Sequence, residues 1–593
     1  MQSQHILFSL ISRLWQHIAL RRRKQFGVLL IMMIMASFTE VFSIGAILPF
    51  LGVLTAPQKV FDHALAQPFI QFLGITSPNQ LLLPLTIMFC SAVLIAGCMR
   101  VLLIWVTMRL SFGAGSDISL DIYRRTLYQP YAVHSSRNSS EVISGITAKA
   151  NSVIFGMLIP ILTIISSFFM LTAILAAIIY VNPFIAFVAF GGFGLLYLAI
   201  IKFTRKRLIV SGECIAREGD NVHKSLQEGL SGIRDVLIDG SQDIYCQIYR
   251  NSDFPMRRAL GDQSFITTAP RYLMESLGML LIAIMAYILA FQPDGVSKAI
   301  PILGALALGA QRLLPVLQQT YSSVSSIVGS QASLRDTLEL LDQPLPKYLN
   351  QPVSKPLPFE KTIALNQITF QYSSESALVL NKLNVSIEKG SRVGIIGSTG
   401  GGKSTMLDIV MGLLDPTEGS LEIDGKIVDE TNKRAWQSHI AHVPQAIFLA
   451  DSSIAENIAF GVPKAKIDYA RVKLAAQQAQ IADAIETWPL QYNTFVGERG
   501  VRLSGGQRQR IGIARALYKQ ADVIIFDEAT SALDTETELA VMQAIDSLSD
   551  NLTIIIIAHR LTTLKNCSQI IELAGGQVKQ VGTYVNIVGT LNK

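Results

Sequence analysis

The stretch that decides the fold of the C-terminal half is Val393-Gly394-Ile395-Ile396-Gly397-Ser398-Thr399-Gly400-Gly401-Gly402-Lys403-Ser404. Its first four residues form a short apolar run that predicts a buried strand. The next eight fit G-x-x-x-x-G-K-[ST] in full, and a helical pattern follows, as a phosphate-binding loop requires. Glycines let backbone N–H groups wrap phosphates, and the start of the helix adds a favourable dipole. We expect Lys403 to reach the β- and γ-phosphates of a nucleotide and Ser404 to bind Mg²⁺.

A second apolar run, Val523 to Phe526, ends in the acids Asp527 and Glu528. Such a strand beside a phosphate loop predicts an α/β domain with a largely parallel sheet. We expect Asp527 to hold Mg²⁺, directly or through water, and Glu528 to polarise the attacking water. The alternative is a pair of acids that only caps the sheet. The intact phosphate loop favours the catalytic interpretation.

The N-terminal half has the composition of a membrane protein. Of 593 residues, 50% are hydrophobic and only 16% are charged, where soluble chains carry roughly a quarter. The net charge of +6 is small for this length and gives no reason to expect a nucleic-acid partner. Segments of ~20 apolar residues span a bilayer. Six segments qualify: 27–54, 81–108, 153–180, 183–202, 271–291 and 299–320.

The charge of the loops predicts the orientation of these segments. Loops 109–150 and 203–266 contain five and nine Lys or Arg, whereas loops 55–80 and 292–298 contain one each. By the positive-inside rule, we expect the long loops and both termini to be cytoplasmic. We expect the chain to be a multi-pass protein of the cell (inner) membrane.

Two connecting segments have patterns of their own. In loop 55–80, five apolar residues recur at helical spacing, which indicates either an amphipathic helix on the external membrane surface or a loop helix packed on its own domain. These residues are Phe61, Leu65, Phe69, Phe72 and Leu73. Residues 342–360 carry five prolines and predict an extended tether. The expected domains are therefore a transmembrane domain at 1–341, a linker at 342–360 and a nucleotide-binding domain at 361–593.

Leu503-Ser504-Gly505-Gly506-Gln507 resembles the signature of the ATP-binding-cassette (ABC) family. The resemblance covers about residues 361–585 and implies ATP and Mg²⁺ as cofactors. It implies that Tyr372 stacks on adenine, that Gln445 senses Mg²⁺ and the transport domain, that Ser531-Ala532-Leu533-Asp534 makes a dimer contact, and that His559 contacts the γ-phosphate. The expected catalytic residues are Glu528, His559 and Gln445. The expected metal ligands are Ser404, Gln445 and Asp527. The expected nucleotide-binding residues are Tyr372, Gly397, Ser398, Thr399, Gly400, Gly401, Gly402, Lys403, Ser404, Thr405, Asp527, Ser504, Gly505, Gly506 and Gln507.

The order of the domains, membrane before motor, resembles exporter half-transporters of the type IV class. Gly497-Glu498-Arg499-Gly500 matches an element of exporters in this family. The family closes the signature of one motor over the ATP of another, so the resemblance implies a dimer of identical chains, or of this chain with a paralogue. It also suggests coupling segments near 129–141 and 235–250. The implied fold is a six-helix transmembrane domain joined to an α/β P-loop NTPase that hydrolyses ATP to drive transport.

Three arginines lie in the inner half of the expected spans: Arg100, Arg271 and Arg312. An arginine inside a membrane usually faces a cavity or a partner, and its planar fork suits phosphate. The alternative is structural pairing with Glu40 and Glu275. With the run from Phe38 to Phe50, these features resemble bacterial flippases for lipid-linked oligosaccharides. That resemblance implies a polyprenyl-pyrophosphate sugar as cargo.

Exporters of lipid A, peptides or hydrophobic drugs remain alternatives of the same class. An ATP-gated channel and a soluble ABC ATPase are alternatives of other classes.

Overall fold

The computed structural model describes the whole chain except residues 1, 47–48, 51–52, 55–56, 63–66, 73, 182, 291–294, 347–348, 350–356, 374, 529–534, 547–550, 559–560 and 592–593. The chain divides into two compact units. The first, here called the helical unit, comprises Met1–Gln129 and Arg137–Leu345. The second, the α/β unit, comprises Pro130–Ser136 and Pro346–Lys593.

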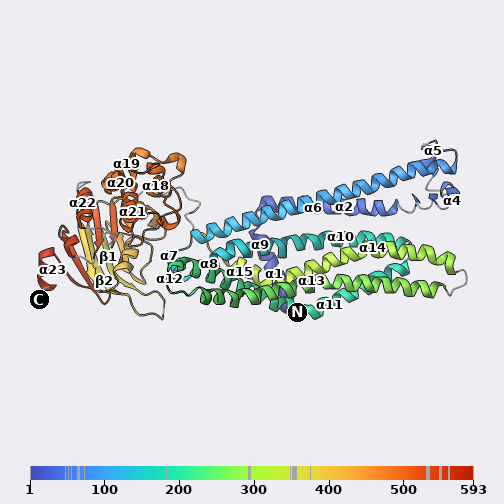
Figure 1. Cartoon of the computed structure of the whole chain (residues 1–593), viewed down its shortest axis with the longest axis horizontal. Helices are drawn as coiled ribbons and strands as arrows, with labels where there is room; N and C mark the ends of the chain where they lie inside the picture. The colour runs from blue at the N-terminus through green and yellow to red at the C-terminus, as the bar shows by residue number, and fades with distance from the viewer. Residues whose placement is uncertain are drawn as a thin grey trace. The chain divides into compact units, whose positions relative to one another are not determined.

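Long helices that run side by side make up the helical unit (Figure 1). They are α1 (Gln2–His17), α2 (Leu20–Gly45), α6 (Leu82–Leu127), α10 (Ile159–Val181), α11 (Pro183–Ser231), α13 (Gln242–Ala290), α14 (Gly295–Gly329) and α15 (Gln331–Leu341). Shorter elements connect them: α4 (Pro57–Phe61), α5 (Gln67–Phe72), a 3₁₀ turn (Pro78–Leu81), α8 (Ser139–Ser144), α9 (Ala150–Val153) and α12 (Ile233–Ile238). Two π-helical turns, Gly145–Lys149 and Ile154–Leu158, flank α9.

Each expected membrane span overlaps one of these long helices, but the bounds differ. The first span was predicted at 27–54, whereas α2 ends at Gly45. Among the described residues, three stretches are long and apolar enough to cross a membrane: Leu20–Ser43, Pro78–Leu127 and Ser139–Ala176.

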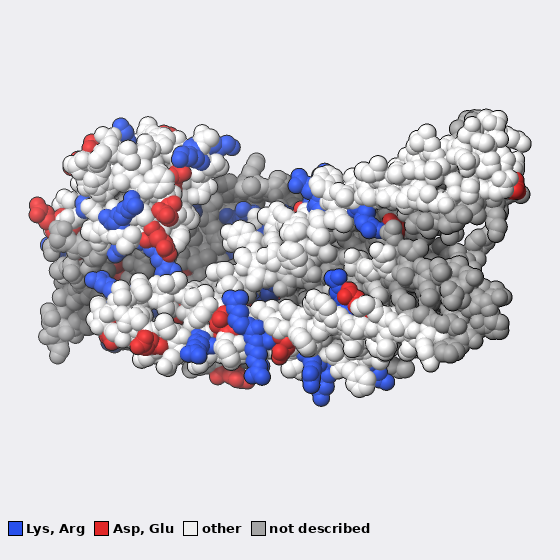
Figure 2. Space-filling model, turned by 45° about the vertical axis from the view of Figure 1, so that its right-hand side comes forward, with Lys and Arg blue, Asp and Glu red and all other residues white. Residues whose placement is uncertain are grey.

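The long basic loops that we expected are themselves mostly helical. Both α11 and α13 have 49 residues, about 74 Å at 1.5 Å per residue, against a hydrocarbon core of ~30 Å. Charged residues such as Lys, Arg and Glu are good helix formers, so a span continues as one helix beyond the bilayer. Figure 2 shows Lys and Arg side chains gathered along one half of the helical unit, while its α4 and α5 end carries few charges on this face.

The segment at 55–80 forms two short helices, α4 and α5, instead of one. Ile70, which the helical pattern omitted, is buried in a cluster with Val53, Leu81 and Leu85. Phe69 of the predicted pattern is exposed. These contacts favour helices packed on their own domain, the second of the two interpretations above. Leu65 and Leu73 lie outside the described residues.

Packing between α11, α13 and α14 shapes the middle of the helical unit. Phe193, Tyr197, Met274 and Tyr321 form one buried cluster there. Pro270 lies inside α13 and cannot donate a hydrogen bond to the carbonyl four residues earlier. That carbonyl, of Ile266, instead accepts from the hydroxyl of Tyr321 at 2.7 Å. The cost of the proline is thus offset by a neighbouring helix.

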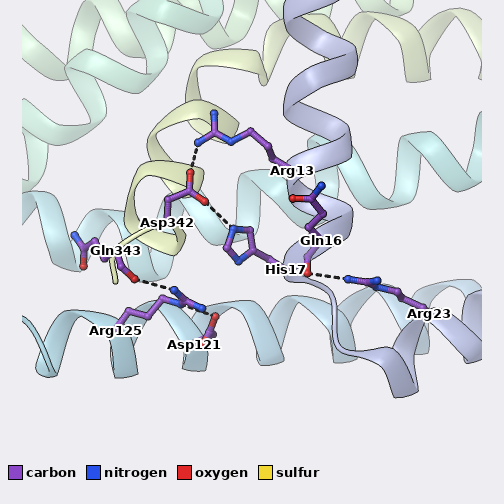
Figure 3. A network of polar contacts seen from close by, with 8 residues as sticks. All are labelled: Arg13, Gln16, His17, Arg23, Asp121, Arg125, Asp342 and Gln343. Atoms are coloured by element: carbon purple, nitrogen blue, oxygen red, sulfur yellow. Dashed lines mark hydrogen bonds and ion pairs between the residues drawn. The ribbon is translucent and has the colours of Figure 1, made fainter. Parts of the chain in front are cut away.

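The end of α15 is held by two other helices of the same unit (Figure 3). Arg13 and His17 of α1 both bind the carboxylate of Asp342, His17 at 2.8 Å. Arg125 of α6 donates to the carbonyl of Gln343 at 2.8 Å. Burial by itself would raise the pKa of Asp342, but the hydrogen bonds from Arg13 and His17 outweigh it and hold the pKa below its ordinary value.

Two sheets organise the α/β unit. The larger has the strand order β10-β9-β3-β8-β7-β6, parallel throughout except for β10. Its strands are β3 (Arg392–Gly397), β6 (Ile440–Val443), β7 (Val523–Asp527), β8 (Thr553–Ile557), β9 (Gln569–Ala574) and β10 (Gln577–Gly582). The smaller is antiparallel, with the order β2 (Leu380–Glu388), β1 (Thr362–Phe370), β4 (Glu418–Ile423) and β5 (Lys426–Ile427).

Helices cover both faces of the larger sheet. They are α16 (Lys403–Val410), α17 (Lys433–Gln437), α18 (Ile454–Ile458), α19 (Tyr469–Gln478), α20 (Ala482–Glu486), α21 (Gly505–Lys519), α22 (Thr535–Asp546) and α23 (Tyr584–Leu591), and α7 (Tyr131–Ser136) is grouped with this unit. Along β7, Ile524 and Phe526 join one core with α18–α21, whereas Ile525 joins the other with α16 and the small sheet. A strand buried on both faces explains why Val523 to Phe526 is apolar without alternation.

Candidate nucleotide site and membrane cavity

The predicted catalytic side chains collect at one edge of the larger sheet. Strands β3, β8, β7 and β6 are parallel neighbours, so their carboxyl ends meet at the same edge. Gly397 ends β3, Asp527 ends β7, and Gln445 follows β6 by two residues. His559 follows β8 by two residues and lies outside the described residues. Ligands of α/β sheets bind at such edges.

The phosphate loop has the backbone that its glycines predict. Gly402 has φ 92°, a conformation that favours glycine, and a Cβ there would lie 2.7 Å from a methyl of Leu380. Lys403, the first residue of α16, donates from Nζ to the carbonyl oxygens of Gly397 at 2.8 Å and Ser398 at 2.9 Å. The outer loop residues, Ser398 to Gly400, are exposed. The exposed loop backbone, the Lys403 cation that it surrounds and the N-terminus of α16 together form a site that suits a polyphosphate.

Tyr372 presents an aromatic ring beside this loop. The ring is 57% exposed, and it meets Phe370 edge-on with centroids 5.0 Å apart. Its hydroxyl lies 3.0 Å from Oγ1 of Thr405, in the first turn of α16. The hydroxyl contact ties the ring to the phosphate-loop helix and leaves a face open for a planar base.

The two acids after β7 differ in environment. Burial raises the pKa of Asp527, and the negative charge of Glu528 raises it further, with Lys403 acting in the opposite direction. A partly buried carboxylate of this kind gains from a cation, and with the exposed hydroxyl of Ser404 it offers the oxygen ligands that Mg²⁺ prefers. Glu528 has the uncommon φ of 50°, and Nε2 of Gln445 donates to its Oε2 at 2.8 Å. The structure thus brings Gln445 and Glu528 together.

Sequence reasoning missed one acid at this edge. Asp408 lies on α16, one turn after Ser404. Burial raises its pKa to about 6, with a further contribution from the charge of Asp527. The only signal was its position four residues after the motif serine, on the same face of the helix.

The signature residues start a different helix, on the other face of the sheet. Ser504 caps α21, accepting from the N–H of Gln507, while the Gln507 side chain accepts from the N–H of Ser504 at 2.9 Å. This reciprocal arrangement is a capping box. Helix α21 packs in the core with α18–α20, whereas α16 packs in the core with the small sheet. Among the described residues, no hydrogen bond joins Ser504–Gln507 to the phosphate loop.

The exporter-like element before the signature is a tight turn. Gly497, Arg499 and Gly500 all have positive φ, at 76°, 51° and 69°. Two glycines at these angles explain the composition of the motif.

A cavity of about 710 Å³ lies within the helical unit and contains two of the three predicted arginines. Arg100 comes from α6 and Arg271 from α13, directly after Pro270. Nη2 of Arg100 lies 2.7 Å from Oε1 of Glu40 on α2, and Nε of Arg271 lies 2.8 Å from Oε1 of Glu275. The structural pairing that we set against anion binding therefore exists for both. The side chain of Arg312 lies outside the described residues.

The two predicted coupling segments have different forms. Within 129–141, α7 is grouped with the α/β unit, which separates it from the domain 1–341 in which we had placed it. Segment 235–250 covers the end of α12, a turn, and the start of α13.

Comparisons with known proteins agree with this architecture. The family described as ABC transporter matches residues 380–531, and that described as ABC transporter transmembrane region matches residues 26–293. The ATP-dependent lipid A-core flippase of Saccharophagus degradans is 31% identical over 482 residues, covering 80% of this chain and 79% of the relative. That of Alkalilimnicola ehrlichii is 28% identical over 473 residues, 79% of each chain.

Among solved structures, a bacterial Atm1-family ABC exporter with ATP bound superposes with a TM-score of 0.77 over 96% of each chain, at 23% identity. This likeness confirms the predicted type IV exporter fold. The family models and the sequence relatives confirm an ATP-hydrolysing domain coupled to transport. The chain is therefore a member of the ABC transporter family, a half-transporter with its transmembrane region and its ATP-binding domain on one polypeptide.

Proposed function

We propose that this transporter flips a lipid-linked oligosaccharide, joined to its lipid by pyrophosphate, across the inner membrane as a homodimer. The observation that carries the proposal is the cavity that holds Arg100 and Arg271. An intramembrane arginine is costly, and two in one cavity favour an anionic cargo.

The rest of the cavity lining suits a phosphate with a sugar attached. Hydroxyl and amide side chains from five helices surround the arginines, and they can donate to and accept from sugar hydroxyls. These residues are Ser37, Thr107, Thr163, Ser166, Thr267, Thr268, Gln318, Gln319, Ser322, Ser323 and Ser326. The apolar remainder, including Met33, Leu103 and Phe155, suits a lipid chain.

The ion pairs do not exclude an anion. Each guanidinium has five N–H donors, and each carboxylate contact described above uses one nitrogen. Arg100 and Arg271 are 50% and 60% exposed, so a phosphate can bind their remaining donors or exchange with the carboxylates. Such an exchange would discriminate against neutral lipids, because these leave the arginines with their acids.

Lipid A-type export is the second candidate, and the similarity to lipid A-core flippases favours it. Both cargoes carry phosphate, sugar and acyl or prenyl chains, so the cavity suits both. They differ in the pyrophosphate bridge and in the number of lipid chains.

The test is a flipping assay in proteoliposomes with each cargo in turn. We expect Arg100→Gln/Arg271→Gln to lose at least about tenfold in flipping of the lipid-linked glycan, since each charged hydrogen bond contributes ~1.5–3 kcal/mol. Basal ATP hydrolysis should persist. The matched control is Arg109→Gln/Arg258→Gln, which removes two charges outside the cavity lining. Unchanged flipping, or flipping of lipid A alone, would overturn the lipid-linked glycan as cargo.

In the motor, we infer that Ser404 and Asp527 would hold Mg²⁺, which would supply positive charge beside the phosphates of ATP. Lys403 binds the same phosphates, and Tyr372 stacks on adenine. Glu528 takes the proton of the attacking water, and its contact with Gln445 orients the carboxylate. We assign the γ-phosphate contact to His559 by its place after β8.

The proposal of a homodimer rests on the spatial separation of the phosphate loop and the signature within one chain. Their helices, α16 and α21, pack on opposite faces of one sheet, so a second copy is the simplest source of a signature facing the bound ATP. A cysteine pair at Ser398 and Ser504 should cross-link between chains when ATP is bound. Either single cysteine serves as the control, and cross-links formed only within one chain would contradict the dimer.

A further inference from the structure

A second cavity, of about 730 Å³, lies between α11 and α13 and shares no residue with the first. On α11, Ile200, Thr204, Arg207 and Ser211 recur at spacings of four, three and four residues. On α13, Asp262, Ile266, Ala269 and Leu273 repeat the same spacing. Such spacing places each set on one face of its helix, so the cavity is a groove along two facing stripes.

The groove is graded from apolar to polar. The chain direction of the two helices is opposite, because α11 leaves the expected span 183–202 and α13 returns to the span 271–291. Ile200 and Leu273 therefore lie at the membrane end, and Ser211 and Asp262 at the cytoplasmic end. Lys206 and Arg207 lie between them, within a few residues of the end of the span. This is the depth of phospholipid headgroups.

Neither cation of the groove is neutralised by the protein. Within the described residues, Lys206 and Arg207 make no ion pair, although Asp262 lines the same groove. Two cations and one carboxylate leave one positive charge. The positive-inside rule explains basic residues on this side, but it does not explain why two of them line one cavity.

The walls beside these cations are apolar and open. Phe265 is 71% exposed, and Val210 and Leu273 are more than half exposed. Phe203, one turn from Lys206 and Arg207, is 84% exposed. Leu273 and Phe203 lie on the membrane side of the two cations, where exposed apolar side chains suit acyl chains rather than water.

We propose that this groove binds an anionic phospholipid of the cytoplasmic leaflet. The phosphate contacts Lys206 and Arg207, and the acyl chains lie along Ile200, Ala269 and Leu273. Asp262 closes the polar end and repels a second anion. The single net positive charge matches a headgroup with one negative charge, as in phosphatidylglycerol.

The groove also lies back to back with the first cavity. Ile266, Ala269 and Pro270 of α13 line the groove, while Thr267 and Arg271 line the cavity. A lipid in the groove would therefore contact the segment around Pro270 that carries Arg271.

The test is lipid binding to the purified full-length protein, measured by native mass spectrometry during titration with phosphatidylglycerol, phosphatidylethanolamine or phosphatidylcholine. We expect Lys206→Gln/Arg207→Gln to weaken phosphatidylglycerol binding about tenfold. Each basic residue near a membrane surface strengthens the binding of anionic lipid, and the double variant removes both contributions. The control, Lys202→Gln/Arg258→Gln, removes one charge at the end of the span 183–202 and one in the loop 203–266, and neither residue lines the groove. It should bind like the wild type.

A third variant separates binding from folding. Asp262→Asn removes the repelling carboxylate and should tighten phosphatidylglycerol binding by about two- to threefold, which a merely destabilised protein would not do. Equal phosphatidylglycerol binding by wild type and Lys206→Gln/Arg207→Gln would overturn the proposal. So would equal binding of phosphatidylethanolamine and phosphatidylglycerol by the wild type. If a second copy of the chain covers the groove, Lys206→Gln/Arg207→Gln will dissociate into monomers with unchanged lipid retention, which also overturns it.

Discussion

The two polar sites of this transporter are built in different ways. At the sheet edge of the α/β unit, Gly397, Lys403 and Asp527 each stand at the end of a strand or the start of a helix, so the backbone places them. In the helical unit, Arg100 and Arg271 stand in the middle of long helices, and other side chains hold them. A site placed by element ends is rigid and has a sequence motif. A site placed by side-chain pairs depends on how the helices pack, and each pair can exchange its partner.

The largest expected effect tests the site placed by the backbone. Glu528→Gln keeps the shape of the side chain but removes the base, so ATP hydrolysis should fall by about 10²–10⁴-fold while ATP binding remains. Phosphate release and binding of a fluorescent ATP analogue measure the two separately. Hydrolysis at the wild-type rate would remove Glu528 from the mechanism.

The next effect tests a site placed by side chains. Lys149 is nearly buried, and its Nζ lies 2.7 Å from both Asp220 on α11 and Asp336 on α15. Lys149→Met leaves two acids facing each other without a cation, so we expect a loss of about 3 kcal/mol in the free energy of unfolding. Thermal unfolding in detergent provides the measurement.

The matched control for this variant is Lys224→Met. Lys224 lies 4.0 Å from Glu228, and both side chains are more than half exposed, so the loss should be under about 0.5 kcal/mol. Adding Asp336→Asn to Lys149→Met should recover part of the stability. Equal losses in the two lysine variants would show that side-chain pairing does not hold these helices together.

A smaller effect concerns the acid that the sequence did not reveal. The pKa of Asp408 is about 6 in the folded chain, above its ordinary value of 3.8. Between these values the folded state binds a proton that the unfolded state lacks, so the contribution of Asp408 to stability falls as the pH rises from about 4 to about 6.

Asp408→Asn removes the loss of stability that accompanies ionisation of Asp408. The melting temperature of the variant should exceed that of the wild type at pH 7.5, and the difference should shrink toward pH 4.5. The comparison is made at each pH between the two proteins, which cancels the titration of all other groups. A difference that does not vary with pH would contradict the raised pKa.

The smallest expected effect is the loss of stability on removing a single helix cap in the α/β unit. Asp468 caps α19, accepting from the N–H groups of Ala470 at 3.0 Å and Arg471 at 3.1 Å. Asp468→Ala should reduce the free energy of unfolding by about 1 kcal/mol and leave ATP hydrolysis per folded molecule unchanged. Lys466→Ala, an exposed change two residues earlier, is the control. If Asp468→Ala lost more free energy of unfolding than Lys149→Met, the expected order of effects in the two units would be reversed.

The membrane helices show what the pattern of apolar residues can and cannot predict. Apolar segments predicted where each span lies, because about 20 apolar residues must cross the bilayer whatever surrounds them. They did not predict that α11 and α13 extend beyond the spans to a total of 49 residues each. A charged helical segment has the composition of a loop, and only the tertiary structure shows which of its side chains pack against other helices.

The sequence by itself determined the family, and it predicted the candidate nucleotide site. Glycines, a lysine and acids at the ends of apolar runs specify a phosphate loop and a sheet edge, because backbone geometry near an element end is local in the chain. Only the tertiary structure decided which acid meets Arg100, that Lys149 joins Asp220 to Asp336, and that Lys206 and Arg207 share a groove with Asp262. These contacts join residues tens to hundreds of positions apart, and they depend on the rotation of each helix about its axis, which long-range packing sets.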